Sequence, residues 1–517
     1  MKNFLKILSL LFFVGFFLAT RLPRMGTDTF NTDEVYWHER SQNFLNAIIT
    51  KDYTKTFQEY HPGVILMWEF SLTALISSKV NHTSLDNVFN NWEELHIDTI
   101  LFINIWILVL SLIAIVVLSK ALKNWWAAFL ILVVLNLEPF YLGNARLIHL
   151  DAQASIYILL ALALTYLATR KINLFFIIAT SFFLALSALT KSIFAGTFVF
   201  CLFAAGLMTF LNQGLKKAAI FFLTIVFFSV GFCFLIFPAL WVAPWPMFSR
   251  IFNESLRVGK DVGHGQIFFG IETRDPGPLF YPTLFVIKTS IFMLFGTTIF
   301  LIDLVIRLVK NRSEKILSSL SHIPFEVFTL IFYLGYFVAI EYFSKKIDRY
   351  IVPIYPFLAL AAVLGWLAFL KKRIYLIIVP VALFIYSVAL PLKSLFPDFL
   401  LYNSPIFGDA SVGNEIVGQK PFGIEVSELR DKIISRYGDK TKVAASDFET
   451  LRAVYPTDVV YNVLVEHPNN YKIMVLGPNK PFPPSLRNEP TIVFYKVDSL
   501  YINGLEFWRI YQKKVIQ

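Results

Sequence analysis

Long apolar runs separated by short polar segments dominate this chain. About eleven runs reach roughly 17 to 25 residues, the length that a helix needs to cross the hydrocarbon core of a bilayer. Their approximate limits are 4–20, 99–118, 125–142, 151–168, 173–189, 193–211, 218–237, 281–306, 324–341, 351–370 and 374–393. The pattern predicts an α-helical polytopic membrane protein with about 11 transmembrane helices in residues 1–393.

The composition agrees with this class. Of 517 residues, 56% are hydrophobic, 17% are aromatic and only 16% are charged, which excludes a soluble globular protein. A net charge of +10 would suggest nucleic acid as a partner of a soluble protein, but here Lys and Arg gather in short loops between apolar runs. We therefore expect no nucleic-acid partner, and membrane lipid around the chain.

The positive charges predict the topology. With the N-terminus inside, each predicted inner loop is basic, as the positive-inside rule requires. These loops contain Lys2 and Lys6, Lys120 and Lys123, Arg170 and Lys171, Lys216 and Lys217, Arg307 to Lys315, and Lys371 to Arg373. The shorter stretch Val64 to Ile76, which carries Glu69, must then be an interfacial or re-entrant helix. We expect outer loops at 21–98 and 238–280, in a plasma membrane if the source is prokaryotic and an ER-type membrane if it is eukaryotic.

The composition changes after Pro391, where Asp, Asn, Lys, Pro and Gly become frequent. β-like runs at 442–445, 471–476 and 491–497 accompany a helical pattern at 426–437. We therefore predict a second domain, residues 394–517, with a small α/β fold. An odd number of spans would place it outside the cytoplasm.

Candidate chemistry begins with Asp33 and Glu34, which we expect in a polar loop after the first span. Adjacent acids in a loop are often only solvated, and that reading is an alternative here. In a membrane protein such a pair could instead deprotonate an acceptor hydroxyl, while Tyr36 and Tyr60 stack on a sugar.

Metal and disulfide signals are sparse. Glu59 and His61 could bind a divalent cation. A lone histidine such as His264 is more often structural, but its flanking glycines allow close approach of a ligand, so it could belong to a metal or phosphate site. No other cofactor is indicated. The proline, glycine and aromatic residues around His264 predict a rigid loop with little regular structure at 238–280. Cys201 and Cys233 lie in apolar runs and indicate no disulfide framework.

Further charged residues gather at predicted outer turns. Arg146, His149 and Asp151 lie at the edge of two spans, where Arg146 could pair with Asp151 or bind a phosphate. Lys191 follows at the next outer turn, with snorkelling as its simpler explanation. Lys345, Lys346 and Arg349, which is followed by Tyr350, then place three cations on the outer side, against the positive-inside trend, which favours an anionic ligand.

The order of these motifs resembles that of GT-C membrane glycosyltransferases. The resemblance is to the protein O-mannosyltransferase and aminoarabinose-transferase group, which uses polyprenyl-phosphate sugars, and it covers roughly the first 390 residues. It rests on Asp33-Glu34, His61-Pro62-Gly63, Asn144-Ala145-Arg146 with Asp151, Leu189-Thr190-Lys191, and Asp348-Arg349-Tyr350 followed by Pro353 and Pro356.

The resemblance implies an inverting transfer from a dolichyl- or undecaprenyl-type lipid phosphate to a hydroxyl or amine of a protein, lipid or glycan. It implies Asp33 as the base, Glu34 as its support and Arg146 in the donor site. Lys191, Lys345, Lys346 and Arg349 are candidates to bind the departing phosphate. The chain departs from the family in lacking the large repeat domain that eukaryotic protein O-mannosyltransferases insert in the middle loop.

Two other classes of function stay open. A transporter or flippase of a lipid-linked or anionic substrate would use broken helices or acids buried at mid-span, and neither is evident in the sequence. A receptor whose C-terminal domain binds a partner would leave Asp33 and Glu34 unexplained.

Overall fold

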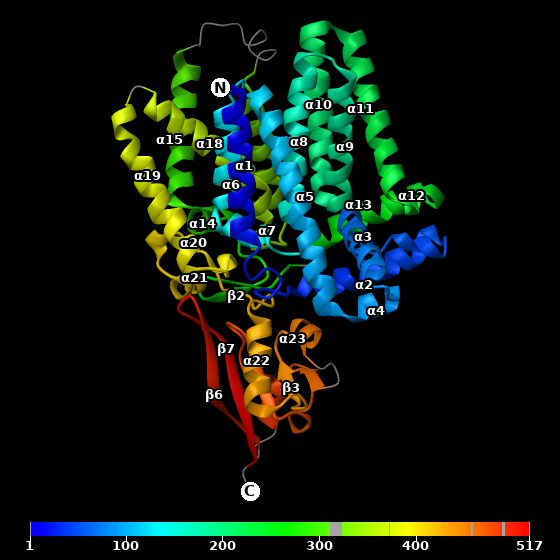
Figure 1. The fold of residues 1–517 in the computed structure, drawn as a ribbon, viewed down its shortest axis with the longest axis vertical. Coiled ribbons are helices and arrows are strands. Elements are labelled where there is room, and N and C mark those ends of the chain that lie inside the picture. Colours follow the sequence, from blue (N-terminus) through cyan, green and yellow to red (C-terminus); the bar gives the residue numbers. More distant parts are fainter. Residues whose placement is uncertain are drawn as a thin grey trace.

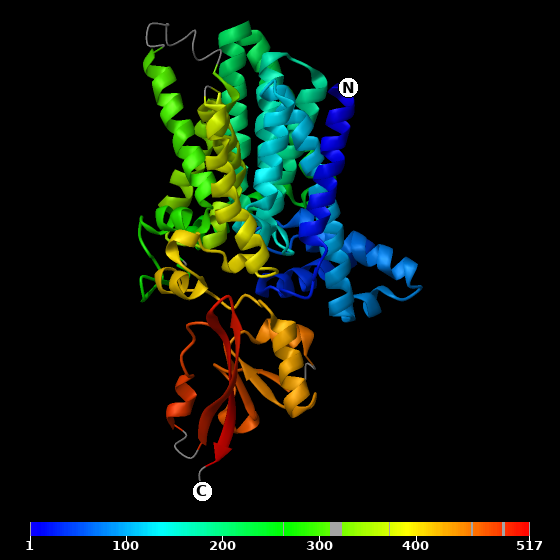
Figure 2. The same cartoon turned by 60° about the vertical axis from the view of Figure 1, so that its left-hand side comes forward.

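The computed structural model describes residues 2–261, 263–310, 323–371, 373–455, 459–488 and 492–515. Tall helices stand side by side in one bundle, and a smaller sheet domain follows at one end of it (Figure 1). The N-terminus lies at the opposite end of the bundle, as the turned view also shows (Figure 2). Predicted inner-loop residues Lys315 and Lys372, and the start of the predicted strand at Thr491, fall outside the described residues.

The bundle confirms the predicted polytopic fold. Within the described residues, nine helices are long and apolar enough to cross a membrane, or ten if one bent pair counts as a span. The shorter apolar helix α9 occupies the predicted span at 173–189. The helices of the bundle are α1 Lys2–Arg21, α5 Trp92–Ala121, α6 Trp125–Leu137, α7 Pro139–Ala145, α8 Leu150–Arg170, α9 Leu174–Thr190, α10 Ala195–Gln213, α11 Leu215–Ile236, α15 Ile291–Lys310, α17 Phe325–Tyr342, α18 Tyr355–Leu370, α19 Ile378–Phe384 and α20 Leu390–Ser394.

Two predicted spans are broken rather than continuous. The run 125–142 bends by 74° between α6 and α7, and 281–306 divides into α14 Phe280–Lys288 and α15. The two breaks meet, because the buried Glu138 carboxylate accepts hydrogen bonds from Ser290 N and Oγ, both at 2.6 Å. A carboxylate at a helix N-terminus satisfies free backbone N–H groups, so the breaks stabilise one another.

The first polar region is helical, contrary to the loop predicted at Asp33 and Glu34. Helices α2 Thr32–Ile49, α3 Val64–Val80 and α4 Leu85–Asn90 lie across the end of the bundle, beside the sheet domain (Figures 1 and 2). Asn31 caps α2 through its side chain, which accepts a hydrogen bond from Glu34 N. The stretch Val64 to Ile76 is thus part of α3, which is not among the membrane-length helices.

The segment 238–280 also has more regular structure than predicted. It contains α12 Ala239–Val242, the 18-residue helix α13 Pro244–Asp261, and a hairpin of β1 Gln266–Phe268 and β2 Ile271–Thr273. The prolines suggested a loop, but Pro244 and Pro246 stand in the first turn of α13, where proline costs no hydrogen bond. Trp245, Phe248 and Phe252 then recur at helical spacing.

The C-terminal region forms the predicted α/β domain. Its five-stranded sheet has the order β4-β3-β5-β7-β6, in which β3 is parallel to β4 and β5, and β7 is antiparallel to β5 and β6. Helix α22 has the predicted limits, whereas α21, α23, β4 and β7 were not predicted. The elements are α21 Ala410–Ile416, α22 Val426–Tyr437, β3 Val443–Ala445, α23 Phe448–Val454, β4 Val460–Asn462, β5 Ile473–Leu476, β6 Ile492–Ile502 and β7 Leu505–Val515.

Candidate active site

Asp33 lies in the first turn of α2, close to the start of α8. The connection is built by the cap residue Asn31, whose Nδ2 donates to Ile148 O at 3.2 Å while its Oδ1 accepts from Glu34 N at 3.0 Å. One side chain therefore fixes both the start of α2 and the segment that leads into α8. This places Asp33 next to His149 and Asp151, which are more than a hundred residues away in sequence.

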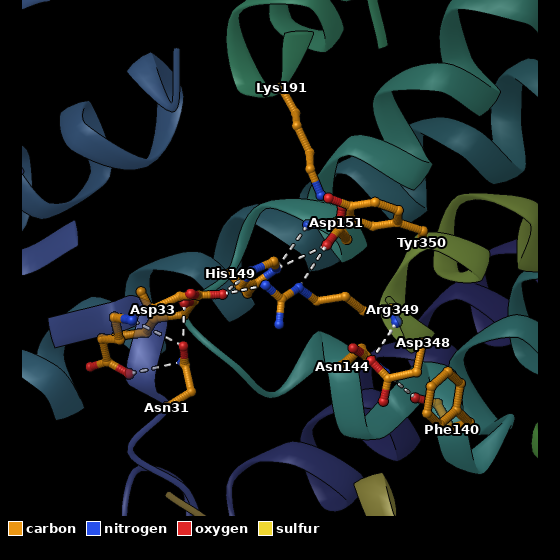
Figure 3. Close-up of polar contacts among 12 residues, drawn as sticks. Asn31, Asp33, Phe140, Asn144, His149, Asp151, Lys191, Asp348, Arg349 and Tyr350 are labelled. Carbon is orange, nitrogen blue, oxygen red and sulfur yellow. Dashed lines mark hydrogen bonds and ion pairs between the residues drawn. The ribbon is translucent and has the colours of Figure 1, made fainter. Parts of the chain in front are cut away.

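The two aspartates share one network of charged groups (Figure 3). Asp33 Oδ2 lies 2.6 Å from Arg349 Nη2 and 3.1 Å from His149 Nε2. His149 Nδ1 lies 3.2 Å from Asp151 Oδ2, and Lys191 Nζ lies 2.8 Å from Asp151 Oδ1. Asp151 is buried, whereas 33% of the Asp33 side chain is exposed. Asp33 is therefore the carboxylate that a ligand can reach.

A second connection brings Lys191 and His61 to the same place. Gly63 N donates to Thr190 O at 3.1 Å, and His61 Nδ1 lies 3.2 Å from Ser192 Oγ. Gly63 has a φ of 57°, and a Cβ there would overlap the Trp37 ring, so the turn before α3 requires glycine. The predicted His61-Pro62-Gly63 motif thus joins α2 and α3 to the end of α9.

The charges around Asp33 set its ionisation. Burial alone would raise the pKa of Asp33, but Arg349 and His149 outweigh burial and hold this pKa below its usual range. Burial together with Lys191 and Lys345 lowers the pKa of His61 well below its usual value. At neutral pH, Asp33 is thus an ionised carboxylate and His61 is uncharged.

A segment of the C-terminal domain crosses this site, and we name residues 417–425 the strap. One end pairs with β1, where Gly418 N donates to Ile267 O at 2.8 Å. The other end is held before α2, where Phe30 N donates to Gly423 O at 3.2 Å, and Trp508 Nε1 donates to Ile424 O at 2.8 Å. The strap therefore ties the sheet domain to the entrance of α2.

The middle of the strap contributes two residues that the sequence analysis missed. The Phe422 ring centre lies 5.3 Å from the Arg349 guanidinium carbon. Lys420 Nζ is buried and has no hydrogen-bond partner in the described part of the chain. Burial, opposed by Asp348 and reinforced by Arg349, lowers the pKa of Lys420 to about 8. A single lysine between glutamine and proline in a polar segment gives no sequence signal that it lies beside Arg349.

Several predicted residues lie elsewhere. The expected pair of Arg146 with Asp151 is wrong, because Arg146 binds Asp28 at 2.9 Å and the carbonyl oxygens of Thr20, Arg21 and Pro23. All five N–H groups of this arginine are used in these bonds. Glu34 is buried and pairs with His96, and Lys346 pairs with Glu341 at 2.5 Å.

The aromatic candidates divide between two places. Tyr350 lies under Lys191, whose Nζ is 4.2 Å from the ring centre, and Tyr60 Oη accepts a hydrogen bond from Lys345 Nζ at 3.4 Å. Tyr36 instead faces the C-terminal domain, where its hydroxyl donates to Glu449 Oε1 at 3.3 Å. Only the first two therefore adjoin the charge network.

The predicted metal ligands do not converge. Glu59 pairs with Arg40 at 3.0 Å and His61 with Ser192. Within the described residues, no three His, Cys, Asp or Glu side chains are arranged to hold a metal ion. His264 lies among cations, and burial together with Lys420 and Arg349 lowers its pKa to about 4. A divalent cation at this site stays a prediction.

Comparisons with known proteins give distant structural likenesses. No family model and no curated protein sequence matches the chain. Among solved structures, it is similar to ArnT from Cupriavidus metallidurans bound to undecaprenyl phosphate, with 13% identity, a TM-score of 0.49, and coverage of 97% of each chain. It is also similar to the archaeal oligosaccharyltransferase AglB from Archaeoglobus fulgidus, in complex with an inhibitory peptide and a dolichol-phosphate. There the identity is 13%, the TM-score is 0.49, and coverage is 92% of this chain and 70% of the other. These likenesses concern the overall arrangement of the chain.

Proposed function

We propose that this protein is a membrane glycosyltransferase that moves a sugar from a polyprenyl-phosphate donor to a hydroxyl or amine acceptor at the outer membrane face. The observation that carries the proposal is a cluster of cations beside an accessible carboxylate, with an apolar groove among the spans close to it in the chain. A lipid-linked phosphate sugar presents the matching groups in the same order, with a long apolar chain, an anion and a reactive anomeric carbon.

The apolar groove lies between α10 and α17. Its volume is about 470 Å³, and its lining includes Ile193, Phe203 and Tyr336. Gly196 and Gly335 also line it, and a Cβ at either position would meet open space, so both glycines leave room for a ligand. A flexible prenyl chain can fill such a groove and reach it sideways from the bilayer.

Two residues of the groove lining connect it to the charge network. Ile193 is two residues from Lys191, and the Tyr336 hydroxyl donates to Tyr350 O at 3.1 Å, directly after Arg349 in the chain. A prenyl chain in the groove would therefore bring its phosphate to the cations around Arg349.

Two of those cations lack a counter-ion. Within the described part of the chain, Lys345 and Lys420 form no ion pair with a carboxylate, and Lys345 Nζ donates a hydrogen bond to the Tyr60 hydroxyl. Burial together with Lys191 and Arg349 lowers the pKa of Lys345. A partly buried cation without a carboxylate partner carries a desolvation cost, which is largest for the buried Lys420 Nζ, and a phosphate would offset it. We assign Lys345, Lys420 and Arg349 to the donor phosphate, in place of Arg146.

The same phosphate would activate Asp33. While Arg349 is bound to Asp33, the carboxylate is a weak base. A phosphate that draws Arg349 to itself would leave Asp33 with a higher pKa and free to accept a proton. Donor binding would therefore prepare the base before the acceptor reacts.

The transfer itself is a single displacement. The acceptor oxygen or nitrogen attacks the anomeric carbon as its proton passes to Asp33, and the bond between that carbon and the phosphate oxygen breaks. The electron pair leaves with the polyprenyl phosphate, which Lys345, Lys420 and Arg349 stabilise. One displacement inverts the anomeric configuration. Asp151 serves as a positioning residue, because it holds Lys191 and His149.

The two broken helices are the one observation that could favour a transporter. Their polar groups bind one another: Glu138 accepts from Ser290, and Lys288 Nζ donates to Tyr402 O at 2.9 Å. Groups that already have partners at a break favour a structural role over a substrate path. The breaks therefore give transport little support.

The test is a transfer assay with purified protein and radiolabelled polyprenyl-phosphate sugars carrying mannose, glucose, galactose or aminoarabinose. Loss of a general base lowers turnover by about 10²- to 10⁴-fold, so we expect that loss in Asp33→Asn with undecaprenyl phosphate binding retained. Asp52→Asn is the matched control, because Asp52 pairs with Lys55 outside the network. Full turnover by Asp33→Asn would refute the assignment of Asp33 as the base. Absence of turnover with every donor would contradict the transferase proposal and favour transport.

A further inference from the structure

A large cleft separates α2 from the C-terminal domain. It has a volume of about 1010 Å³ and lies between α2, the start of α5, and helices α22 and α23. On α2 its lining includes Val35, Glu39 and Gln42. Because helix residues advance by about 100° each, these side chains project from the face roughly opposite to Asp33. None of the residues in the Asp33 network lines the cleft.

Four aromatic side chains line this cleft: Tyr36, Trp92, Phe448 and Tyr455. The Trp92 ring is held by His38, which stacks on it with ring centres 4.0 Å apart and an angle of 8°. Tyr36 is 43% exposed. Rings whose orientation is fixed before binding can cover the apolar C–H face of a sugar at little cost in entropy.

Planar hydrogen-bonding groups alternate with these rings. Arg430 pairs with Glu93 and, at 2.9 Å, with Asp431, while Glu449 accepts from Tyr36. Glu39 and Arg452 also line the cleft. Carboxylates and guanidinium groups can each bond two neighbouring hydroxyls, which is the pattern that a sugar ring presents beside its apolar face.

The charge of the lining selects among ligands. The lining contains four carboxylates and two guanidinium groups, so carboxylates outnumber cations two to one. The carboxylates are those of Glu39, Glu93, Asp431 and Glu449, and the cations are Arg430 and Arg452. Such a lining repels phosphate, nucleic acid and acidic sugars, and favours neutral or amino sugars. The volume is at the upper end of the range for ligand pockets, about 300 to 1,000 Å³, and admits more than one sugar ring.

We propose that this cleft binds an oligosaccharide that carries no acidic group. Its place on the far side of the catalytic helix would let a glycan acceptor, or a glycan that has just been extended, be held while its reacting end lies near Asp33. That identification as an acceptor rests on the proposed function. The binding of sugar rests on the cleft alone.

The test uses the full chain in lipid nanodiscs, because maltoside and glucoside detergents would themselves present sugars to the cleft. Calorimetry would compare three tetrasaccharides: glucosamine, N-acetylglucosamine and galacturonic acid tetramers. We expect the first two to bind and the acidic one to bind at least tenfold more weakly. A preference for the acidic tetramer, or no binding of any tetramer, would overturn the proposal.

Variants locate the binding. Tyr36→Ala and Phe448→Ala each remove a ring from the cleft, and each should weaken binding of the glucosamine tetramer about tenfold. Trp245→Ala is the matched control, because Trp245 is 81% exposed on α13 and away from the cleft, and it should change affinity less than twofold. Unchanged affinity in both cleft variants, with melting temperatures kept, would refute the site.

Binding of undecaprenyl phosphate would be measured in the same samples. Tetramer binding without lipid-phosphate binding would refute the proposed function and support the cleft as a sugar-binding site. Lipid-phosphate binding without tetramer binding would refute the cleft as a sugar-binding site and would not contradict the proposed transferase function.

Discussion

The two sides of α2 present opposite chemistry. On one side, Asp33 is surrounded by cations, two of which, Lys345 and Lys420, lack a carboxylate partner in the described residues. On the other side, carboxylates outnumber cations two to one among aromatic rings. One side fits a phosphate, and the other repels it.

This difference shows how one helix can separate two substrates. In our proposals, charge would direct a donor with a phosphate to the Asp33 side and a sugar without acidic groups to the cleft. The C-terminal domain takes part in both, because its strap supplies Lys420 to the first and its helices α22 and α23 form a wall of the second. The domain is thus part of the catalytic unit in our account.

Among the variants, Arg349→Gln should lower the rate of sugar transfer the most. The change removes a phosphate ligand and the partner that orders Asp33, so kcat/KM for transfer should fall about 10³-fold. Without Arg349, the pKa of Asp33 should rise toward its ordinary value, and the acid limb of the pH profile of kcat/KM should move to higher pH. A kcat/KM series over pH measures both effects.

The control for this arginine is Arg40→Gln. Arg40 lies on α2, the same helix as Asp33, and the change removes its ion pair with Glu59. Its kcat/KM should stay within about threefold of the wild type. Equal losses in the two variants would mean that Arg349 acts through folding alone.

Lys420→Gln should weaken the donor side next. Losing one charged hydrogen bond to a phosphate should raise the Kd for undecaprenyl phosphate about 10- to 100-fold. Because the pKa of Lys420 is about 8 in the free protein, wild-type affinity should fall as the pH rises through 8, as the lysine loses its charge. The variant should lack this fall.

Lys440→Gln provides the comparison for Lys420, since Lys440 is exposed after α22. It should bind the lipid phosphate like the wild type at every pH. The same pH dependence in Lys420→Gln as in the wild type would contradict the assignment of Lys420.

Gly423→Ala should act on the strap by a smaller amount. Gly423 and Gly438 both have positive φ, of 66° and 86°, but a Cβ would overlap Phe30 O only at Gly423. Gly438→Ala should cost about 1 kcal/mol of stability from φ alone. Gly423→Ala should cost about 2 kcal/mol more and weaken lipid-phosphate binding severalfold, because the strap carries Lys420. Melting temperatures and binding isotherms that match in the two variants would separate the strap from the site.

Glu39→Lys should give the smallest effect and change only the cleft. Glu39 is exposed, so a reversed charge should weaken binding of the glucosamine tetramer about three- to fivefold and strengthen binding of the acidic tetramer. Binding of undecaprenyl phosphate should be unchanged. A parallel change on the donor side would show that the two faces of α2 are not independent.

Much of the fold could be predicted because bilayer thickness imposes a length on apolar runs. Each of the eleven predicted spans falls on one or more observed helices. The bend at Glu138 and the break at Ser290 were missed, because each depends on a hydrogen bond between segments far apart in sequence. Helix α13 was missed because its prolines were read as loop signals.

The site was predicted less completely. Asp33, Asp151, Lys191 and Arg349 were identified as charges in unusual places, and the structure brings them together. Arg146 gave the same signal, but its partner Asp28 lies in a loop whose path no local pattern reveals. Lys420 could not be identified, since its position depends on the docking of a separate domain.

The most direct test is a structure of the protein with bound undecaprenyl phosphate. We predict that the prenyl chain lies between α10 and α17, that the phosphate contacts Lys345, Lys420 and Arg349, and that Arg349 has left Asp33. A phosphate bound elsewhere, or one bound here while Arg349 stays on Asp33, would contradict the account of how the donor activates its base.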